Sequence, residues 1–339
     1  MLRFSALFAS TAVCAGIAGV ALANDSMAEL GAGGLILVHS NVVAMESEDL
    51  FISQEAVRVD YVFRNRSDKT VESLVAFPMP DIAGDPYANV AIPEPSADNF
   101  LGFAATADGK PLSPQLEQKA FALEIDVSED LKRNGIPLFP YAEGMEAALD
   151  RLPAATKADW LSRGILIVDT YDDDGTGMKD HLTPIWRLKS TYWWRMAFPA
   201  GEPVRVQHSY RPSVGGSVGL AFIEDGKPGG EAHAQYREKY CLDAAFDRAV
   251  QKAIDRTPEG EIPFTETWLS YILTTGGNWA TNIEKFHLTI DKGDPNALVS
   301  FCGEGVKKTG PTTFEIRTEN FYPERDLHIL ILKRPEAAQ

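Results

Sequence analysis

The sequence predicts a mainly β protein with an antiparallel β-sandwich architecture, arranged as one or two sandwiches. Two observations support this fold class. Short runs of β-branched and aromatic residues alternate with polar residues at period two, which is typical of half-buried strands. Turns rich in glycine and proline, such as 107–111 and 292–295, separate these runs. Many short strands joined by such turns favour sheets that pack face to face.

The expected strands follow this alternation along the chain. The clearest is 57–63, where valine, tyrosine or phenylalanine occupies every second position. The run 73–77 ends at a Pro-Met-Pro sequence, which removes backbone donors needed for pairing. Similar runs predict strands at 35–43, 102–106, 121–127, 185–198, 204–210, 265–274, 283–290, 313–317 and 327–332.

Helices are expected to be secondary to the strands. Apolar positions spaced for a helix predict short helices at 129–133 and 143–152, and a third at 156–163 begins just beyond Pro153. The strongest amphipathic pattern predicts one helix at 238–254.

These elements divide the chain into an N-terminal β segment (24–127), a mixed helical insertion (128–183) and a C-terminal β segment (184–339). The C-terminal segment contains the helix expected at 238–254. The pattern leaves open whether the two β segments form one domain or two.

The first 23 residues have the pattern of a cleavable signal peptide. Arg3 precedes an apolar stretch (4–22) that ends in the small-x-small sequence Ala21-Leu22-Ala23, after which the chain becomes polar. A retained transmembrane helix is the alternative, but the stretch is alanine-rich, of marginal length and lacks a basic flank after it. A lipoprotein signal at Cys14 is disfavoured because further apolar residues follow that cysteine. We therefore expect cleavage after Ala23 and a periplasmic or secreted protein.

Cleavage would leave two cysteines, Cys241 and Cys302. An even pair in an oxidising compartment predicts one disulfide, with free thiols as the alternative. A bridge across this separation would stabilise the fold by about 4 kcal/mol in the chain-entropy model. A zinc site would need two further ligands, and none lies near either cysteine in the sequence.

The formal net charge of −16 disfavours nucleic acid and anionic membrane surfaces as partners. After residue 23 no apolar run approaches membrane length, so the mature chain is not expected to span a bilayer.

Two short motifs suggest chemistry, but neither has the required context. Ser217 lies in a G-x-S-x-G sequence, yet no convincing helix follows it, so a flexible loop is the favoured interpretation. Asp172 and Asp174 precede a glycine turn and are weak metal candidates, because the loop lacks acidic residues at both ends of a calcium-loop alignment. The histidines are scattered, and we assign no cofactor and no catalytic residue.

The aromatic run Tyr192-Trp193-Trp194 is the most unusual local feature. In a strand, Tyr192 and Trp194 would face one side and Trp193 the other. We take these three residues and His208 as weak candidates for ligand binding. The alternative is that their rings fill the core.

Several stretches carry a resemblance to a known family. They are 24–35, 57–80 with its Ala76-Phe77-Pro78-Met79-Pro80 end, 192–201, 207–216, 300–308 and 323–327. Together they resemble proteins of the bacterial DUF4424 family and cover nearly the whole mature chain. The resemblance implies an exported bacterial protein of unknown function, and it supplies no catalytic residues.

The leading hypothesis is therefore an exported, non-enzymatic binding or envelope-structural protein, whose partner would be another envelope protein or a glycan. A periplasmic hydrolase assembled from distant residues, with Ser217 or His208 as first suspects, and a carbohydrate-binding module are the alternatives.

Overall fold

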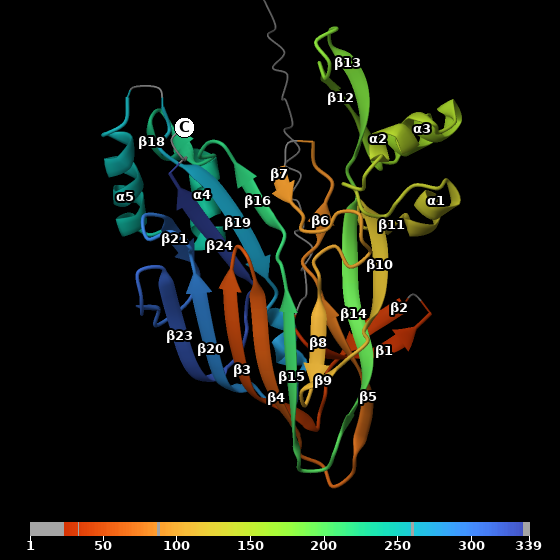
Figure 1. The fold of residues 1–339 in the computed structure, drawn as a ribbon, viewed down its shortest axis with the longest axis vertical. Helices are drawn as coiled ribbons and strands as arrows, with labels where there is room; N and C mark the ends of the chain where they lie inside the picture. Colours follow the sequence, from red (N-terminus) through yellow and green to blue (C-terminus); the bar gives the residue numbers. More distant parts are fainter. Residues whose placement is uncertain (1–23, 33, 87–88, 259–260, 335–339) are drawn as a thin grey trace, which may run out of the picture.

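The computed structural model describes residues 24–32, 34–86, 89–258 and 261–334, and within these ranges the protein is mainly β. The predicted signal peptide, residues 1–23, lies outside them. Strands form three larger sheets and two separate hairpins, and most pairs are antiparallel. The seven-stranded and eight-stranded sheets face each other as a sandwich (Figure 1). The fold class predicted from the sequence is therefore confirmed.

The seven-stranded sheet has the order β11-β10-β14-β5-β1-β2, and a short strand, β6, also pairs with β14. Its strands are β1 (Ser26–Gly31), β2 (Gly34–Val38), β5 (Val71–Pro78), β6 (Ile82–Ala83), β10 (Gln115–Ala122), β11 (Ile125–Asp126) and β14 (Arg187–Phe198).

The eight-stranded sheet has the order β22-β23-β20-β3-β4-β15-β8-β9. Its strands are β3 (Val43–Ser53), β4 (Val57–Asn65), β8 (Ala104–Ala107), β9 (Lys110–Pro111), β15 (Pro203–Tyr210), β20 (Ile283–Asp291), β22 (Lys307–Lys308) and β23 (Thr313–Phe321). The pair β3–β20 is parallel and brings residues 43–53 beside residues 283–291 within one sheet.

The five-stranded sheet has the order β21-β24-β19-β16-β7 and continues the fold upward in Figure 1. Its strands are β7 (Asn89–Ala91), β16 (Val214–Ser217), β19 (Thr265–Tyr271), β21 (Leu298–Phe301) and β24 (Leu327–Lys333). The separate hairpins are β12 (Leu166–Tyr171) with β13 (Lys179–Pro184), and β17 (Ile223–Glu224) with β18 (Lys227–Pro228).

Both large sheets draw strands from the two β segments of the sequence. In the seven-stranded sheet β14 lies between β10 and β5, and in the eight-stranded sheet β15 lies between β4 and β8. The main core, which includes Tyr61, Phe77, Trp194 and Ile329, therefore contains side chains from both segments. The two segments fold together around this core.

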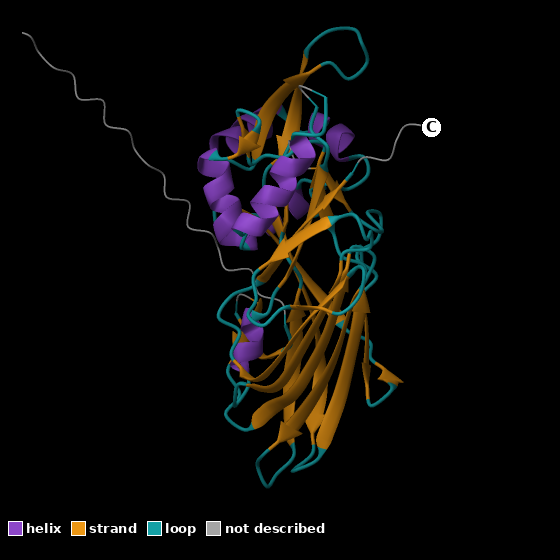
Figure 2. Cartoon of the chain, turned by 90° about the vertical axis from the view of Figure 1, so that its left-hand side faces the viewer, coloured by secondary structure: helices purple, strands orange, loops and turns teal. Residues whose placement is uncertain are grey.

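Helices occupy the ends of the sandwich rather than its faces, and Figure 2 shows most of them toward the upper end of the molecule. The insertion contains α1 (Ser128–Arg133), α2 (Met145–Asp150) and α3 (Ala154–Ser162). These helices bury a second apolar cluster that includes Trp160 and Trp186. A 3₁₀ helix, η1 (Thr274–Asn278), lies beside β1.

The single helix predicted at 238–254 is two helices, α4 (Gly230–Tyr240) and α5 (Ala244–Ile254). Cys241 ends α4 in the left-handed conformation, with φ of 55°. Asp243 then caps α5 by accepting the backbone N–H groups of Ala245 and Phe246. The amphipathic pattern thus predicted α5 correctly. The break between α4 and α5 depends on the local conformation of Cys241 and the cap at Asp243, which the apolar pattern does not indicate.

The predicted disulfide between Cys241 and Cys302 is present, with a Cα–Cα distance of 5.0 Å. It joins the end of α4 to the residue after β21. The bridge therefore fixes a helix to the edge of the five-stranded sheet.

Candidate functional site beneath the amino-terminal hairpin

The hairpin formed by β1 and β2 folds back over the outer face of the seven-stranded sheet. Leu35 and Leu37 of β2 pack against Trp193, Leu74 and Ala76, which belong to strands farther into that sheet. The hairpin thereby covers apolar side chains that would otherwise face solvent.

Gly34 permits the closest approach between the hairpin and β10. A Cβ atom at this position would lie 2.2 Å from Glu117 Oε1, and the backbone φ of +110° also favours glycine. The next residue, Leu35, donates its backbone N–H to Glu117 Oε1 at 3.2 Å. The tip of the hairpin is therefore held on a strand that is not its neighbour in the sheet.

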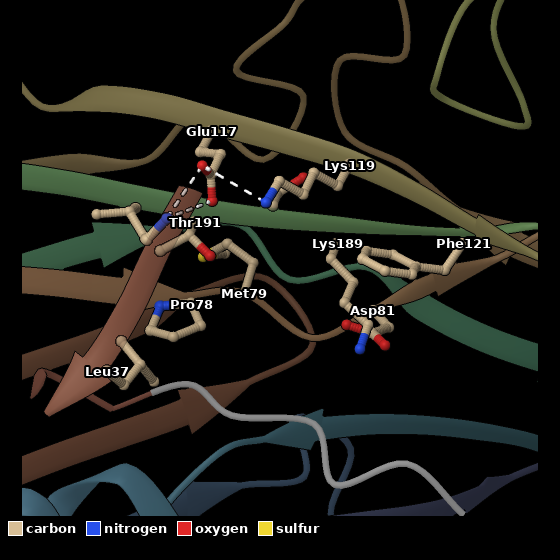
Figure 3. Close-up of a pocket in the computed structure, with 11 residues that line it drawn as sticks. Leu37, Pro78, Met79, Asp81, Glu117, Lys119, Phe121, Lys189 and Thr191 are labelled. Carbon is tan, nitrogen blue, oxygen red and sulfur yellow. Dashed lines mark hydrogen bonds and ion pairs between the residues drawn. The ribbon is translucent and has the colours of Figure 1, made fainter. Parts of the chain in front are cut away.

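The space between the hairpin and the sheet is a pocket with a volume of about 230 Å³ (Figure 3). We call it the outer pocket. Its lining comprises Leu35, Leu37, Pro78, Met79, Asp81, Glu117, Lys119, Phe121, Lys189, Ser190 and Thr191.

One side of the outer pocket is apolar and the other is charged. Leu37, Pro78 and Met79 lie on the apolar side, and the side chains of Lys119 and Lys189 lie on the charged side (Figure 3). The Nζ atom of Lys189 lies 4.9 Å from the centroid of the Phe121 ring, a cation–π contact. The pocket can thus contact both parts of an amphipathic molecule.

The two carboxylates of the pocket already have partners. Glu117 accepts the Leu35 N–H and has Lys119 Nζ 3.9 Å from Oε1. Burial raises the pKa of Asp81, whereas the positive charges of Lys189 and Arg187 oppose this increase. Arg187 Nε lies 3.9 Å from Asp81 Oδ2.

Lys189 differs from these groups. Among the residues that the structure describes, no carboxylate oxygen lies within 4.0 Å of its Nζ atom, and its close partner is the ring of Phe121. Its charge acts on Asp81 from beyond that distance, and its ammonium can donate a hydrogen bond to an added anion.

The structure separates the four aromatic and histidine candidates of the sequence. Tyr192, Trp194 and His208 are buried within the main core, where the centroids of the Trp194 and His208 rings are 5.3 Å apart. Trp193 points to the opposite face and packs under the hairpin. Ligand binding by these residues remains a prediction, and the buried three have no route to a ligand in this conformation.

His208 is enclosed by rings rather than aligned with a reactive group. Its Nε2 atom lies 3.7 Å from Asp25 Oδ1, and neither ring nitrogen has a hydrogen-bond partner among the described residues. Burial lowers its pKa to about 3, so the ring is neutral near pH 7.

Ser217 and the acidic turn are used in local structure. Ser217 Oγ donates to the carbonyl of Gly219 at 2.8 Å, and the chain continues as a turn rather than a helix. Asp172 and Asp174 accept backbone N–H groups within the β12–β13 turn. Lys179 Nζ lies 2.7 Å from Asp174 Oδ2, so an ammonium already neutralises this carboxylate.

Comparison with known proteins places the chain in a family. The model for a domain of unknown function, DUF4424, matches residues 23–330. The chain belongs to the DUF4424 family. No curated protein matches it. Its fold is similar to a crystal structure from Legionella pneumophila, titled a "putative nutrient binding protein", with 15% identity, 92% of this chain and 71% of the other covered, and a TM-score of 0.45.

Sequence reasoning did not single out the charged residues of the outer pocket in this DUF4424 protein. The alternation in 187–198 does place Lys189 and Thr191 on the same strand face as Trp193. On that face, only Trp193 was named as a candidate from the sequence. Among the described residues, no helix is long and apolar enough to cross a membrane.

Proposed function

We propose that this protein is an exported, non-enzymatic binding protein whose outer pocket holds a small organic anion with an apolar part. The observation that supports this function is the position of Lys189, a cation without a close carboxylate among the described residues, opposite an apolar wall. Ligand sites in proteins commonly combine apolar walls with a few polar groups that fix orientation.

The chemistry of the lining favours an anion over a cation. Asp81 is already balanced by the positive charges of Lys189 and Arg187, and Glu117 by Lys119 and a backbone N–H. An added anion would gain a charge-assisted hydrogen bond from Lys189. An added cation would have to displace an existing partner from one of the carboxylates.

The size and polarity of the pocket favour a carboxylate attached to a small apolar group. Thr191 lies two residues from Lys189 on the same strand and offers a second polar group, a hydroxyl, in the pocket lining. The apolar part of the ligand would then contact Leu37 and Met79. The volume of about 230 Å³ limits the ligand to a small molecule.

Export is the second part of the proposal. The signal-like sequence of residues 1–23 supports it, and the Cys241–Cys302 disulfide is of the kind that persists in an oxidising compartment. The disulfide would contribute stability without a cofactor.

Calorimetric titration with phenylacetate, phenylacetamide and benzylamine tests the ligand class. These probes share an aromatic ring and differ in charge. We expect phenylacetate to bind at least about tenfold more tightly than the other two, since only it pairs with Lys189. Equal binding of all three probes, or none, would contradict the proposal.

Lys189→Met is the decisive variant, and Lys110→Met is its control because Lys110 is exposed on β9 away from the pocket lining. Methionine retains much of the aliphatic chain without the charge. We expect Lys189→Met to weaken phenylacetate binding about tenfold or more and Lys110→Met to leave it unchanged.

A further inference from the structure

The first described residues of the chain lie in the centre of the protein. Asn24, Asp25 and Ser26 are each 0% exposed. The backbone N–H of Asn24 donates to Thr275 Oγ1, and Thr275 Oγ1 donates back to the Asn24 carbonyl at 2.7 Å. The segment is therefore inserted into the core rather than laid across the surface.

Side chains from β3, from β4 and from the residue after η1 complete this attachment. Asn24 Nδ2 donates to Glu48 Oε2 of β3 at 3.0 Å, and Tyr61 of β4 donates to Asn24 Oδ1 at 2.5 Å. Trp279 Nε1 donates to the carbonyl of Asp25 at 2.8 Å. Such a set of buried hydrogen bonds specifies one position for Asn24.

This region contains two buried carboxylates without a cation among the described residues. Both carboxylate oxygens of Asp25 and Oε1 of Glu48 have no hydrogen-bond partner there. The nearest basic group in that part of the chain is His208, 3.7 Å from Asp25. A buried carboxylate without a partner is costly unless it is protonated or paired.

The basic residue present cannot supply a full charge. Burial holds the pKa of His208 at about 3, so it is neutral where the carboxylates ionise. Burial likewise raises the pKa of Glu48 to about 8, opposed by the hydrogen bond from Asn24. One positive charge placed between Asp25 and Glu48 would therefore stabilise the ionised form of either acid.

We propose that the Ala23–Asn24 bond is the processing site, and that the new α-ammonium of Asn24 is the cation of this buried cluster. Hydrolysis breaks the amide bond. Water supplies the hydroxyl that converts the Ala23 carbonyl to a carboxylate and the hydrogen that the Asn24 nitrogen gains. The amine then takes up a proton. The inference rests on the cleavage predicted from the sequence and is independent of the outer pocket.

The position of the nitrogen supports this assignment. The Asn24 nitrogen donates to Thr275 Oγ1, and an ammonium there would carry two further N–H donors inside this buried cluster. The cluster contains the carboxylate of the next residue, Asp25, and that of Glu48, which the Asn24 side chain reaches through Nδ2 at 3.0 Å. The α-amino group ordinarily has a pKa near 7.7 to 8.0; burial would lower this pKa, and the negative charge of the two acids would raise it and favour the ammonium. One ammonium and one proton would then neutralise both acids.

The fold also orders the events. Asn24 is 0% exposed, so the nitrogen of the cleaved bond would be enclosed in the folded protein. On this proposal, cleavage comes before the core closes, and the completed core contains the chain terminus created by that cleavage.

The first test uses the full chain expressed with its own leader and recovered from the cell envelope. Intact mass and terminal sequencing should give Asn24 as the first residue. An amine-reactive probe at neutral pH should label the α-amine at least about tenfold more slowly in the native state than in denaturant. A different first residue, or rapid native labelling, would overturn the proposal.

The second test measures the charge coupling. Ala23→Gln should block cleavage, since the peptidase requires a small residue there. All variants are purified and melted in the same mild detergent. We expect the uncleaved chain to melt at least about 3 °C lower than the cleaved chain.

The coupling to Glu48 is measured by repeating the comparison of cleaved and uncleaved chains in a Glu48→Gln variant. Glu46→Gln is the control. The glutamine side chain in Glu48→Gln keeps an acceptor for Asn24, whereas Glu46 is partly exposed and pairs with Arg64. The difference should shrink by half or more with Glu48→Gln and persist with Glu46→Gln. An equal difference in all backgrounds, or no difference in the parent, contradicts an ammonium partner.

Discussion

Glu117 of β10 accepts the backbone N–H of Leu35 of β2 at 3.2 Å, although three strands lie between β10 and β2 in the order of the sheet. This contact is made across the outer face of the sheet rather than along its hydrogen-bonded ladder. It closes the hairpin over Trp193 and forms one side of the outer pocket.

Replacement of Glu117 by alanine should loosen the hairpin. The change leaves the Leu35 N–H without its acceptor and removes one ion-pair partner of Lys119, so we expect the free energy of unfolding to fall by about 1–2 kcal/mol. Chemical denaturation measures this loss. Glu72→Ala, an exposed position on β5, should change stability by less than about 0.5 kcal/mol. Equal effects of the two variants would contradict the role assigned to Glu117.

Removal of the disulfide should lower stability without changing the outer pocket. The double variant Cys241→Ser, Cys302→Ser lacks a bridge that closes a separation of 61 residues, which corresponds to about 4 kcal/mol in the chain-entropy model. Denaturation with and without reductant measures the effect. Reductant should destabilise the parent and leave the double variant unchanged.

His208 should contribute to loss of stability in acid. Its folded pKa of about 3 lies below its unfolded value near 6.5, so the unfolded chain binds the proton first. This contribution is fully present above pH 6.5 and is lost as the pH falls toward 3, by at most about 1.4 kcal/mol per pH unit. Asp25 and the ring of Tyr61 face His208 in the core.

Denaturation at a series of pH values measures this term in the parent and in His208→Phe. Phenylalanine fits a site already surrounded by rings, including Phe77 and Trp194. The variant should show a shallower dependence of stability on pH between 6 and 4, whatever its stability at pH 7. An unchanged slope would show that His208 does not titrate in this way.

Gly215 should tolerate no side chain. Trp268 is its cross-strand partner, and a Cβ atom at Gly215 would lie 2.2 Å from the indole Nε1. Gly215→Ala should therefore destabilise the five-stranded sheet by about 1–3 kcal/mol through overpacking. Gly219→Ala is the matched control, since the nearest atom would lie 3.9 Å away. Thermal melting of both variants distinguishes the two positions.

The alternating strands were predictable because their period reflects burial of one face. The run at 57–63 lies within β4, and 185–198 contains β14. By contrast, 35–43 contains most of β2, the connection after it and the first residue of β3, and the long strand β3 was not recognised. The alternation in β3 is interrupted by a bulge between Met45 and Ser47, which shifts the register by one residue.

Most of helix α4 was not predicted, because its sequence lacks a regular apolar pattern. The helix is mostly polar and buries Tyr240 at its end, so it has no apolar stripe. Its attachment depends on the Cys241–Cys302 bridge, which was predicted, and on contacts with strands distant in the sequence.

The outer pocket could not be assembled from the sequence. Its walls come from β2, β10 and β14, which lie far apart in the chain, and their meeting depends on the hairpin turning back over the sheet. The sequence predicted that Trp193 would face the opposite side of the strand from Tyr192 and Trp194. It did not indicate that β2 would pack over Trp193.

A crystal structure with bound 4-bromophenylacetate tests the proposed function most directly, because the anomalous signal of bromine locates the ligand. The account predicts the carboxylate at Lys189 and the bromine against Leu37 and Met79, with this density absent in Lys189→Met. Bromine density located elsewhere, or unchanged in the variant, would contradict a binding site in the outer pocket.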